Sequence, residues 1–393
     1  MRVVLSTIGS RGDVQPVVAL ALRLREMGHE ARLCAPPDFR GWIEGLGIEF
    51  VPLGPEVRPE VRPDSETRRL AASPEGVKQL VEGTVATQFE TLLPAADGCD
   101  VVLAWSVLQV AAPSVAEKLG IRHVYATFSP NQLPSGQLAP APMPGWQQPA
   151  DVDNRTLWAM ESRRWNDIWR PAVNSRRESI GLPPIDDVLT HVNSPRPWLA
   201  ADPVLGPWPD GSDVVQTGAW LMRDTRPLPA DLARFLDAGE PPVFFGFGST
   251  GAAPADIGRT MLAAAREHGR RAMISRGWAD LELPDADDAL VIDEANFQAL
   301  FPRVAAVVHH GGSGTTTVTA ISGTPHVIVP HRYDQFYWAA RVEALGIGVR
   351  AAVESLASGL DGALRPEVAA AAKSVAAELV PDGVEIAADL LVN

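Results

Sequence analysis

The sequence predicts an α/β protein made of two doubly wound, Rossmann-like domains that face each other across a cleft. Its 393 residues exceed what one ordinary hydrophobic core supports, so two domains are expected. Short apolar runs alternate with amphipathic segments through the first half of the chain, and the alternation restarts after residue 226. Repeated strand–helix–strand units give parallel sheets with right-handed crossovers and helices on both faces.

The N-terminal domain is expected to cover residues 1–205. It begins with a strand over 3–7 and a helix over 16–27, in which apolar side chains recur on one face and Gly28 ends the helix. Further strands are predicted over 31–34, 48–52, 101–104 and 123–126. Further helices are predicted over 39–46 and 110–119.

A long aperiodic segment follows these units. Residues 129–149 are rich in Pro, Gln, Gly and Ser, and so long a segment inside a compact domain is usually functional or mobile. A helix predicted over 156–180 carries Trp158, Trp165 and Trp169. These rings have two interpretations: they belong to the core, or they form an apolar platform for a large aromatic or polycyclic partner.

The second half repeats the alternation after a linker predicted over 206–226, where Pro, Asp and Gly are frequent. The C-terminal domain is expected over 227–375, and a C-terminal helix within 376–393 is expected to pack back on the N-terminal domain. Strands are predicted over 243–246, 271–275, 289–292, 304–308 and 326–329. Helices are predicted over 257–268, 334–345, 368–379 and 384–391.

Composition narrows the class of protein. Apolar residues make up 46% of the chain and charged residues 21%, which is typical of a globular protein. The net charge of −14 argues against nucleic acid or an anionic membrane as a partner, because both require clustered Lys and Arg. The two cysteines show no metal-ligand spacing, and no apolar run is long enough for a signal peptide or a membrane span. A cytoplasmic enzyme is expected.

The most informative segment is 309–317, which reads His-His-Gly-Gly-Ser-Gly-Thr-Thr-Thr. It lies between an apolar strand and the predicted start of a helix. Unpaired N–H groups and the positive end of the helix dipole make such a turn an anion site. Its glycines, Gly312 and Gly314 among them, let a phosphate approach the backbone, and Ser313 and Thr315 add hydroxyl donors.

The spacing of this turn matches neither the dinucleotide fingerprint nor the ATPase loop. A diphosphate held by backbone, hydroxyls and one imidazole, with no lysine and no evident metal ligand, indicates a nucleotide-sugar site. His310 immediately precedes the glycines and is expected to point at the phosphates, the alternative being a strand-end histidine satisfied by backbone groups. His309 is expected to be structural.

A second cluster, Ser10-Arg-Gly-Asp13, stands at the carboxyl end of the first predicted strand. Asp13 is the only acidic side chain between Met1 and Glu26. One interpretation is a helix N-cap ahead of Pro16, since Asp is a favoured cap. The other is a general base. Inverting sugar transfer requires one base within hydrogen-bond reach of the acceptor hydroxyl, whereas the departing diphosphate needs electrostatic stabilisation. Asp13 and the His310 turn would supply these from opposite walls.

Three further positions carry weaker signals. Asp334 and Gln335 begin a predicted helix and can hydrogen-bond to vicinal sugar hydroxyls, the alternative being a helix cap with an exposed glutamine. Ser249 lies in another glycine-bearing turn after a strand. Trp278 also follows a strand, where it either stacks on a nucleobase or packs in the core.

Taken together, these strings resemble the two-domain, GT-B fold glycosyltransferases that decorate antibiotics, above all those of vancomycin-group glycopeptide biosynthesis. The resemblance covers nearly the whole chain. It is carried by Gly9–Asp13, Ala116–Gly120, Asn174–Ser175, Ser179–Pro184, Trp198–Leu205, Gln216–Trp220, Gly246–Ser249, Ser275–Asp280, the His309 turn and Asp334–Gln335.

The resemblance implies an inverting transferase that needs no metal or other cofactor and takes a dTDP- or UDP-sugar. Asp13 matches the family's base, and Ser10 and Gly12 match positions where donor and acceptor meet. The positions that match donor contacts are Ser249, Trp278, His310, Gly312, Ser313, Gly314, Thr315, Asp334 and Gln335.

The acceptor is where this chain departs from the glycopeptide enzymes, because residues 129–169 match them poorly. A glycopeptide aglycone is the first expectation, with contacts at Gln132, Trp146 and Trp158. The opening Gly-Ser-Arg-Gly-Asp-Val-Gln-Pro is shared with sterol and macrolide glycosyltransferases, which remain an alternative. The bulky Phe336-Tyr-Trp338 leaves the donor sugar open. A nucleotide-sugar epimerase or a non-enzymatic partner protein on the same fold are further alternatives, and a monomer is expected.

Overall fold

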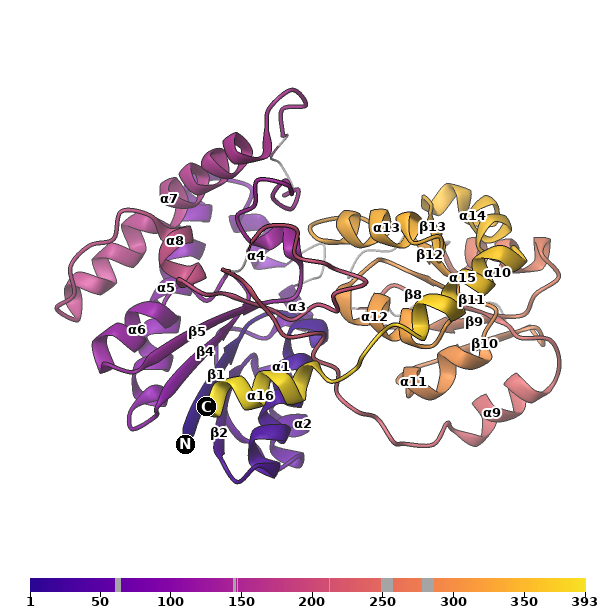
Figure 1. The fold of residues 1–393 in the computed structure, drawn as a ribbon, viewed down its shortest axis with the longest axis horizontal. Coiled ribbons are helices and arrows are strands. Elements are labelled where there is room, and N and C mark those ends of the chain that lie inside the picture. The colour runs from indigo at the N-terminus through magenta and orange to yellow at the C-terminus, as the bar shows by residue number, and fades with distance from the viewer. Residues whose placement is uncertain (61–64, 144–145, 147, 212, 249–256, 278–285) are drawn as a thin grey trace.

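The computed structural model describes residues 1–60, 65–143, 146, 148–211, 213–248, 257–277 and 286–393. Within them the chain forms two parallel β-sheets, each covered by helices, one in each half of the molecule (Figure 1). The predicted α/β fold with two doubly wound domains is confirmed.

The N-terminal sheet has the strand order β3-β2-β1-β4-β5-β6-β7, with every neighbouring pair parallel. The strands are β1 (Arg2–Thr7), β2 (Glu30–Ala35), β3 (Glu49–Pro52), β4 (Val101–Trp105), β5 (Arg122–Thr127), β6 (Trp198–Leu199) and β7 (Val215–Gln216). The helices are α1 (Arg11–Glu26), α2 (Arg40–Gly45), α3 (Val57–Glu60), α4 (Glu66–Leu70), α5 (Pro74–Ala96), α6 (Ala112–Leu119), α7 (Asn154–Ser179) and α8 (Val188–Asn193).

The C-terminal sheet has the order β10-β9-β8-β11-β12-β13 and is also parallel. Its strands are β8 (Val243–Gly246), β9 (Ala272–Ser275), β10 (Ala289–Ile292), β11 (Ala306–His309), β12 (His326–Ile328) and β13 (Gly348–Arg350). Its helices are α9 (Ala230–Asp237), α10 (Ile257–Glu267), α11 (Phe297–Leu300), α12 (Ser313–Ile321), α13 (Gln335–Ala344), α14 (Leu356–Ala363) and α15 (Pro366–Ala376).

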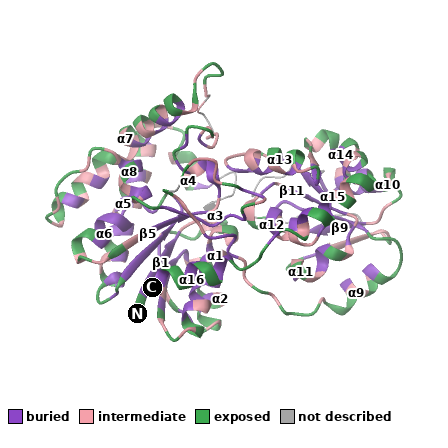
Figure 2. Ribbon diagram, in the orientation of Figure 1, coloured by how far each residue is buried: buried purple, intermediate pink, exposed green. Residues whose placement is uncertain are grey.

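The strand order reverses direction at one point in each sheet, between β1 and β4 and between β8 and β11. In open parallel sheets, ligands bind outside the carboxyl ends of the strands at such reversals. The central strands are buried on both faces, as the purple strands of Figure 2 show, and are therefore apolar along their length. The fold thus defines two ligand-binding edges, one after β1 and one after β11.

The last helix, α16 (Gly383–Val392), returns to the N-terminal domain and lies beside α1 (Figure 1). Val384, Ala387, Ala388 and Leu391 are buried in the same hydrophobic cluster as α1. The Arg122 guanidinium donates to the carbonyl oxygens of Leu390 and Leu391 at the end of α16. The two domains are therefore joined by two chain crossings.

The structure differs from the predicted linker over 206–226. Val215 and Gln216 form β7, the edge strand of the N-terminal sheet, paired with Trp198 and Leu199. Trp220 is also buried in the N-terminal core. The linker prediction was wrong for this part, because a two-residue strand in a segment rich in Pro and Gly leaves no periodic pattern to recognise.

Candidate active site

The carboxyl edges of the two sheets face each other where the domains meet. The hydroxyl of Ser313, at the start of α12, contacts the carbonyl oxygen of Phe128 after β5, at 3.4 Å. The Arg11 guanidinium, at the start of α1, pairs with Glu294 of the C-terminal domain at 3.6 Å. The segments after β1 and after β11 therefore belong to one interdomain site.

Asp13 is held at one carboxylate oxygen. Its Oδ2 accepts hydrogen bonds from the backbone N–H of Ser10 at 2.8 Å and from the Ser10 hydroxyl at 3.2 Å. Gly9 adopts a φ of +121°, and a Cβ there would overlap Asp13 Oδ2, so this position requires glycine. Oδ1 accepts no hydrogen bond from the described residues and is not sealed inside the protein. One oxygen of the carboxylate is left for a ligand.

The pKa of Asp13 is raised to about 6, mainly because burial removes water from the carboxyl group. The hydrogen bonds from Ser10 and the nearby charge of Arg332 act in the opposite direction. The carboxyl is thus mostly ionised at neutral pH and retains more proton affinity than an exposed aspartate. That combination suits a general base.

The helix-cap interpretation of Asp13 takes a different form in the structure. Helix α1 begins at Arg11, five residues earlier than the predicted start at Pro16, and Ser10 is its N-cap residue. Asp13 lies in the first turn, where a negative charge is favoured by the helix dipole. Its Oδ2 stabilises the helix start, and its Oδ1 remains available for chemistry.

The glycine-rich turn forms a helix start with unpaired donors. Gly312 is the N-cap of α12, so Ser313, Gly314 and Thr315 occupy its first turn, where backbone N–H groups have no intrahelical acceptor. No hydrogen bond among the described residues uses these three N–H groups. A Cβ at Gly314 would meet no atom of the other described residues within 4 Å. Open space in front of unpaired N–H groups fits an anionic ligand.

His310 lies between two glycines. A Cβ at Gly312 would approach its Nε2 to 2.5 Å, and one at Gly248 would approach its Cε1 to 3.1 Å. Nδ1 is buried and has no partner with hydrogen-bond geometry among the described residues, although the backbone of Gly246 lies near enough to raise the pKa of the ring slightly. Burial lowers the pKa of His310 to about 4, with the charge of Arg332 among the smaller contributions. A neutral imidazole is thus presented beside the turn.

His309 is buried and serves the turn itself. Its Nδ1 accepts the N–H of Gly311 at 3.1 Å, so its Nε2 carries the proton that it shares with Nδ1 of His326, also at 3.1 Å. Gly311 has a φ of +88°, and a Cβ there would lie 2.7 Å from Ile328 Cγ2. This geometry agrees with the structural role expected for His309.

The alternative for Asp334 and Gln335 holds in part: Asp334 is the N-cap residue of α13, but its side chain makes no cap hydrogen bond and Gln335 is not exposed. Asp334 is buried, makes no side-chain cap, and accepts from the indole Nε1 of Trp338 at 2.9 Å. Burial raises the pKa of Asp334 to about 7, and the charge of Asp13 contributes in the same direction. The carboxyl groups of the two domains therefore lie close enough to interact.

Gln335 is buried and supports the loop before α13. Its amide oxygen accepts the backbone N–H groups of His331 at 2.8 Å and Arg332 at 3.1 Å. Its amide nitrogen has no hydrogen-bond partner among the described residues, which leaves two donors for a ligand. Arg332 was not predicted from the sequence as a site residue. The available signal for it was its place in the loop after the strand that ends at Ile328.

The positions proposed for the acceptor have mixed surroundings. Gln132 follows β5, and its amide oxygen accepts the Thr127 hydroxyl at the carboxyl edge of the sheet. Trp146 is half-buried under the Arg164 guanidinium, 5.7 Å from its ring centroid. The platform interpretation was wrong for Trp158, which is 8% exposed and donates to the Leu138 carbonyl at 2.8 Å.

The other two tryptophans of α7 also serve packing. Trp165 is buried, stacks on Trp169 with ring centroids 5.7 Å apart, and donates to Glu161 at 2.8 Å. Two of the proposed donor contacts, Ser249 and Trp278, lie outside the described residues.

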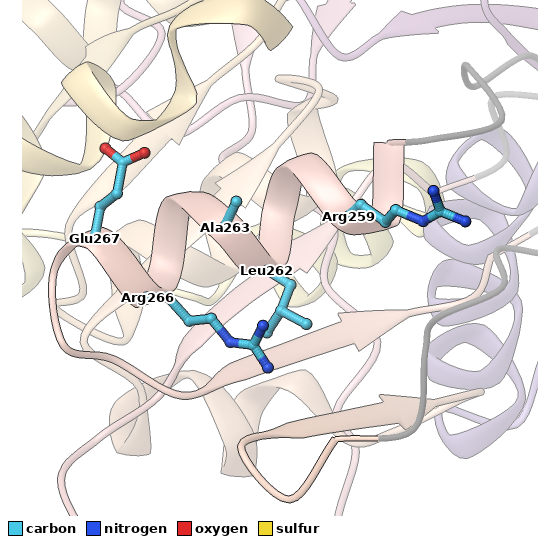
Figure 3. A pocket seen from close by; sticks show the side chains of 5 residues that line it. All are labelled: Arg259, Leu262, Ala263, Arg266 and Glu267. Carbon is cyan, nitrogen blue, oxygen red and sulfur yellow. The ribbon is translucent and has the colours of Figure 1, made fainter.

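A surface hollow elsewhere does not compete with this site. Its five lining side chains, Arg259, Leu262, Ala263, Arg266 and Glu267, all project from α10 (Figure 3). In the described part of the chain no three His, Cys, Asp or Glu side chains gather closely enough to hold a metal ion. No helix in the same part is long and apolar enough to cross a membrane.

Comparison with known proteins assigns the class. Residues 3–133 match the N-terminal domain of glycosyltransferase family 28, and residues 282–389 match the C-terminal domain of proteins like erythromycin biosynthesis protein CIII. The glycotransferase of kitacinnamycin has a similar fold, with a TM-score of 0.72 and 21% identity over 99% of this chain and 98% of that one. The protein is a glycosyltransferase of the GT-B fold.

The family follows from two relatives in Amycolatopsis orientalis. The vancomycin aglycone glucosyltransferase is 45% identical over 100% of this chain and 97% of its own length. The dTDP-epi-vancosaminyltransferase is 43% identical over 95% and 93%, respectively. The chain belongs to the vancomycin-group glycopeptide glycosyltransferases, and this membership favours transfer over the epimerase and the non-enzymatic alternatives.

Proposed function

We propose that the protein moves a sugar from a dTDP- or UDP-sugar to a hydroxyl of a glycopeptide aglycone, with inversion at the anomeric carbon. One relative is named for the vancomycin aglycone and the other for a dTDP-linked sugar, and these names supply the acceptor and donor classes. The observation that carries the proposal is the placement of Asp13 at the interdomain edge, where it interacts with Asp334 and Arg332 of the other domain.

In this proposal Asp13 is the general base. Its free Oδ1 takes the proton of the acceptor hydroxyl while that oxygen attacks the anomeric carbon from the face opposite the diphosphate. Ser10 fixes Oδ2 through its N–H and hydroxyl, so the carboxylate does not need to reorient during the reaction. A single displacement of this kind inverts the configuration of the sugar.

The C-terminal domain holds the donor. The N–H groups at the start of α12 and the imidazole of His310 bind the diphosphate, since the N–H groups have no acceptor among the described residues and the imidazole lies against Gly312 of the same turn. The amide nitrogen of Gln335 and the carboxyl of Asp334 bind sugar hydroxyls. A neutral His310 donates one hydrogen bond, and diphosphate binding raises its proton affinity.

The decisive experiment combines a screen with two variants. Mass spectrometry of mixtures of glycopeptide aglycones with dTDP- and UDP-sugars identifies the productive pair, and NMR of the product gives the anomeric configuration. Asp13→Ala is expected to lower kcat by about 100-fold or more, with donor affinity nearly unchanged. His310→Ala is expected to raise the donor KM and to slow transfer.

Asp97→Asn is the matched control, because Asp97 is an exposed carboxylate at the end of α5 and should leave transfer unchanged. Wild-type turnover in Asp13→Ala would rule out the base, as would a loss that unfolding explains completely. Donor binding unaffected by His310→Ala would remove the imidazole from the diphosphate site. Retention of the anomeric configuration would exclude the single displacement.

A further inference from the structure

Arg332 is a cation inside the site that the mechanism above does not use. It lies in the loop between β12 and α13, at the same carboxyl edge as the His310 turn. The residue is half-buried, and its charge acts on Asp13 of the opposite domain as well as on Asp334, His310 and His331. Its charge therefore acts on carboxyl groups of both domains.

The guanidinium of Arg332 has no carboxylate partner among the described residues, in contrast to the other arginines near the cleft. Arg11 pairs with Glu294, and Arg276 pairs with Asp293 at 3.2 Å. Arg332 lies over the ring of its neighbour Tyr333, 5.5 Å from the centroid, and forms no ion pair with a described residue. The segments 249–256 and 278–285, which the structure does not describe, contain no Lys or Arg in their sequence and therefore add no further cation.

The loop that carries Arg332 is fixed at its backbone. The Gln335 amide oxygen accepts the N–H of Arg332 and that of the preceding residue. Tyr333 adopts a φ of +54°, a conformation that costs free energy in a non-glycine residue and persists where the surroundings impose it. An unpaired, half-buried guanidinium on an anchored loop is a pre-organised anion-binding group.

We propose that Arg332 is a catalytic residue that stabilises the negative charge appearing on the nucleoside diphosphate as it departs. The proposal rests on the glycosyl transfer proposed above. In that step the acceptor oxygen forms a bond to the anomeric carbon, and its proton passes to Asp13. The bond from that carbon to the β-phosphate oxygen breaks, and its electron pair remains on the phosphate.

The diphosphate gains one negative charge when it loses the sugar. A permanently charged guanidinium beside it therefore interacts more strongly with the product-like transition state than with the intact donor. The N–H groups of α12 and the neutral His310 contribute dipoles and no full charge. Arg332 supplies the missing full charge, so its removal should affect turnover more than donor binding.

The test compares Arg332→Met with Arg332→Lys and with Arg365→Met. Arg365 is an exposed arginine paired with Asp361 on the far helices of the C-terminal domain, so it controls for the loss of one positive charge. Calorimetry gives the Kd of free dTDP or UDP and that of the intact donor sugar. Kinetics give kcat and both KM values, and also the rate of donor hydrolysis without acceptor.

We expect Arg332→Met to lower kcat by about 100-fold, as the loss of a transition-state charge contact does. The Kd of this variant for the free nucleoside diphosphate should rise more than its Kd for the donor sugar. The rate of donor hydrolysis should fall together with kcat. Arg332→Lys should restore part of the affinity and part of both rates. The acid limb of the pH profile should also move to higher pH, because Arg332 lowers the pKa of Asp13 and its loss removes that effect. The other titratable groups around Arg332 are Asp334, His310, His331 and Tyr333.

Any one of four results would overturn the proposal. Nucleoside diphosphate affinity that stays at the wild-type value, even with a shifted pH profile, would reduce Arg332 to an electrostatic neighbour of Asp13. A rise confined to the acceptor KM would assign it to the acceptor. Equal losses in Arg332→Met and Arg332→Lys, with lowered melting temperatures in both, would make it structural. Asp13→Ala separates the two proposals. An active Asp13→Ala variant would refute the proposed transfer mechanism. An inactive Asp13→Ala variant together with a fully active Arg332→Met variant would refute only the proposal for Arg332.

Discussion

The two carboxylate oxygens of Asp13 have different surroundings. Oδ2 is bound by the N–H and hydroxyl of Ser10, whereas Oδ1 has no partner among the described residues. Gly9 makes room for this arrangement, since a Cβ at that position would overlap the carboxylate. The carboxyl is thus both rigid and reactive, which is what a base that acts in one orientation requires.

The raised pKa of Asp13 predicts the acid side of the pH profile. As the proposed base, Asp13 must be ionised to accept a proton, and burial raises its pKa to about 6. We expect kcat/KM to be near its plateau above this value and to fall roughly tenfold per pH unit below it. Stopped assays between pH 4.5 and 8 measure this limb. A limb centred near the ordinary aspartate value would show that burial does not tune Asp13 in solution.

The raised pKa of Asp334 predicts that removing its charge stabilises the fold at high pH but weakens transfer. Its pKa rises from an ordinary 3.8 to about 7 on folding, so the folded state binds more protons than the unfolded state between these values. Stability from this group is therefore present below pH 3.8 and is lost as pH rises through about 7. Asp334→Asn keeps an acceptor for Trp338 and removes the buried charge.

We expect Asp334→Asn to be more stable than the wild type at pH 8 by on the order of 1 kcal/mol or more, and to show a smaller difference at pH 5. Urea unfolding at both values measures the change. Transfer should weaken, because the sugar loses a charged acceptor. A variant that is less stable at pH 8 would show that the ionised carboxylate is fully compensated in the fold.

At the scale of the element, the unit from β11 through the glycine-rich turn to α12 has separate parts for folding and for binding. Gly311 sits at a φ of +88° against Ile328, and His309 fixes its N–H, so these residues set the shape of the turn. The hydroxyls of Thr316 and Thr317 donate hydrogen bonds to the carbonyl oxygens of Gly312 and Ser313 in the first turn of α12. Gly314 neither shapes the turn nor makes such a bond, and a Cβ there would meet none of the other described residues.

Gly314→Ala therefore tests the donor site without disturbing the turn. A Cβ at this helical position meets no atom within 4 Å in the described part of the chain, so stability should be unchanged or higher by up to about 1 kcal/mol. The same methyl group would occupy the space where the diphosphate approaches the backbone. We expect the donor Kd to rise by about tenfold, which calorimetry with the donor or its free nucleoside diphosphate measures.

Gly83→Ala is the matched control, because Gly83 is also helical, in α5, and a Cβ there also meets nothing within 4 Å. Both variants should gain similar stability, and only Gly314→Ala should weaken donor binding. Equal donor affinity in the two would place the diphosphate away from the start of α12.

Helix α1 is an element whose first residue could not be predicted from the sequence. Pro16 suited a first turn, so the predicted start fell there, but the helix begins at Arg11 and holds Pro16 in its interior. Helix α5 was missed altogether, although it packs Val85, Phe89 and Leu92 into the core. Both errors arise because tertiary contacts override local preference: β1 and the cleft fix where α1 starts, and the sheet supplies the partner for α5.

At the scale of the whole molecule, α16 makes the C-terminus a part of the N-terminal domain. Leu391 is fully buried against the N-terminal core, whereas its neighbour Leu390 is 41% exposed. The same substitution at adjacent positions therefore measures this docking with little change in composition. Because the chain crosses between the domains twice, α16 also limits how freely they move apart.

We expect Leu391→Ala to lower the free energy of unfolding by about 2–5 kcal/mol, and Leu390→Ala to change it by less than about 0.5 kcal/mol. Urea denaturation of the full chain measures both. Tryptophan fluorescence, to which Trp105, Trp198 and Trp220 of the same cluster as α16 contribute, should also change when the helix undocks. Equal effects of the two substitutions would mean that α16 is not docked in solution.

The sequence by itself determined the fold class, the family and the two chemical turns, because these depend on local patterns. Alternating apolar runs specify parallel sheets, and Ser10–Asp13 and His309–Thr317 each follow one strand and open one helix. Tertiary structure alone decided which side chains of α7 are core, that β7 joins the first sheet, and that the charge of Arg332 acts on Asp13 of the other domain. These depend on contacts between distant segments, which no local pattern encodes.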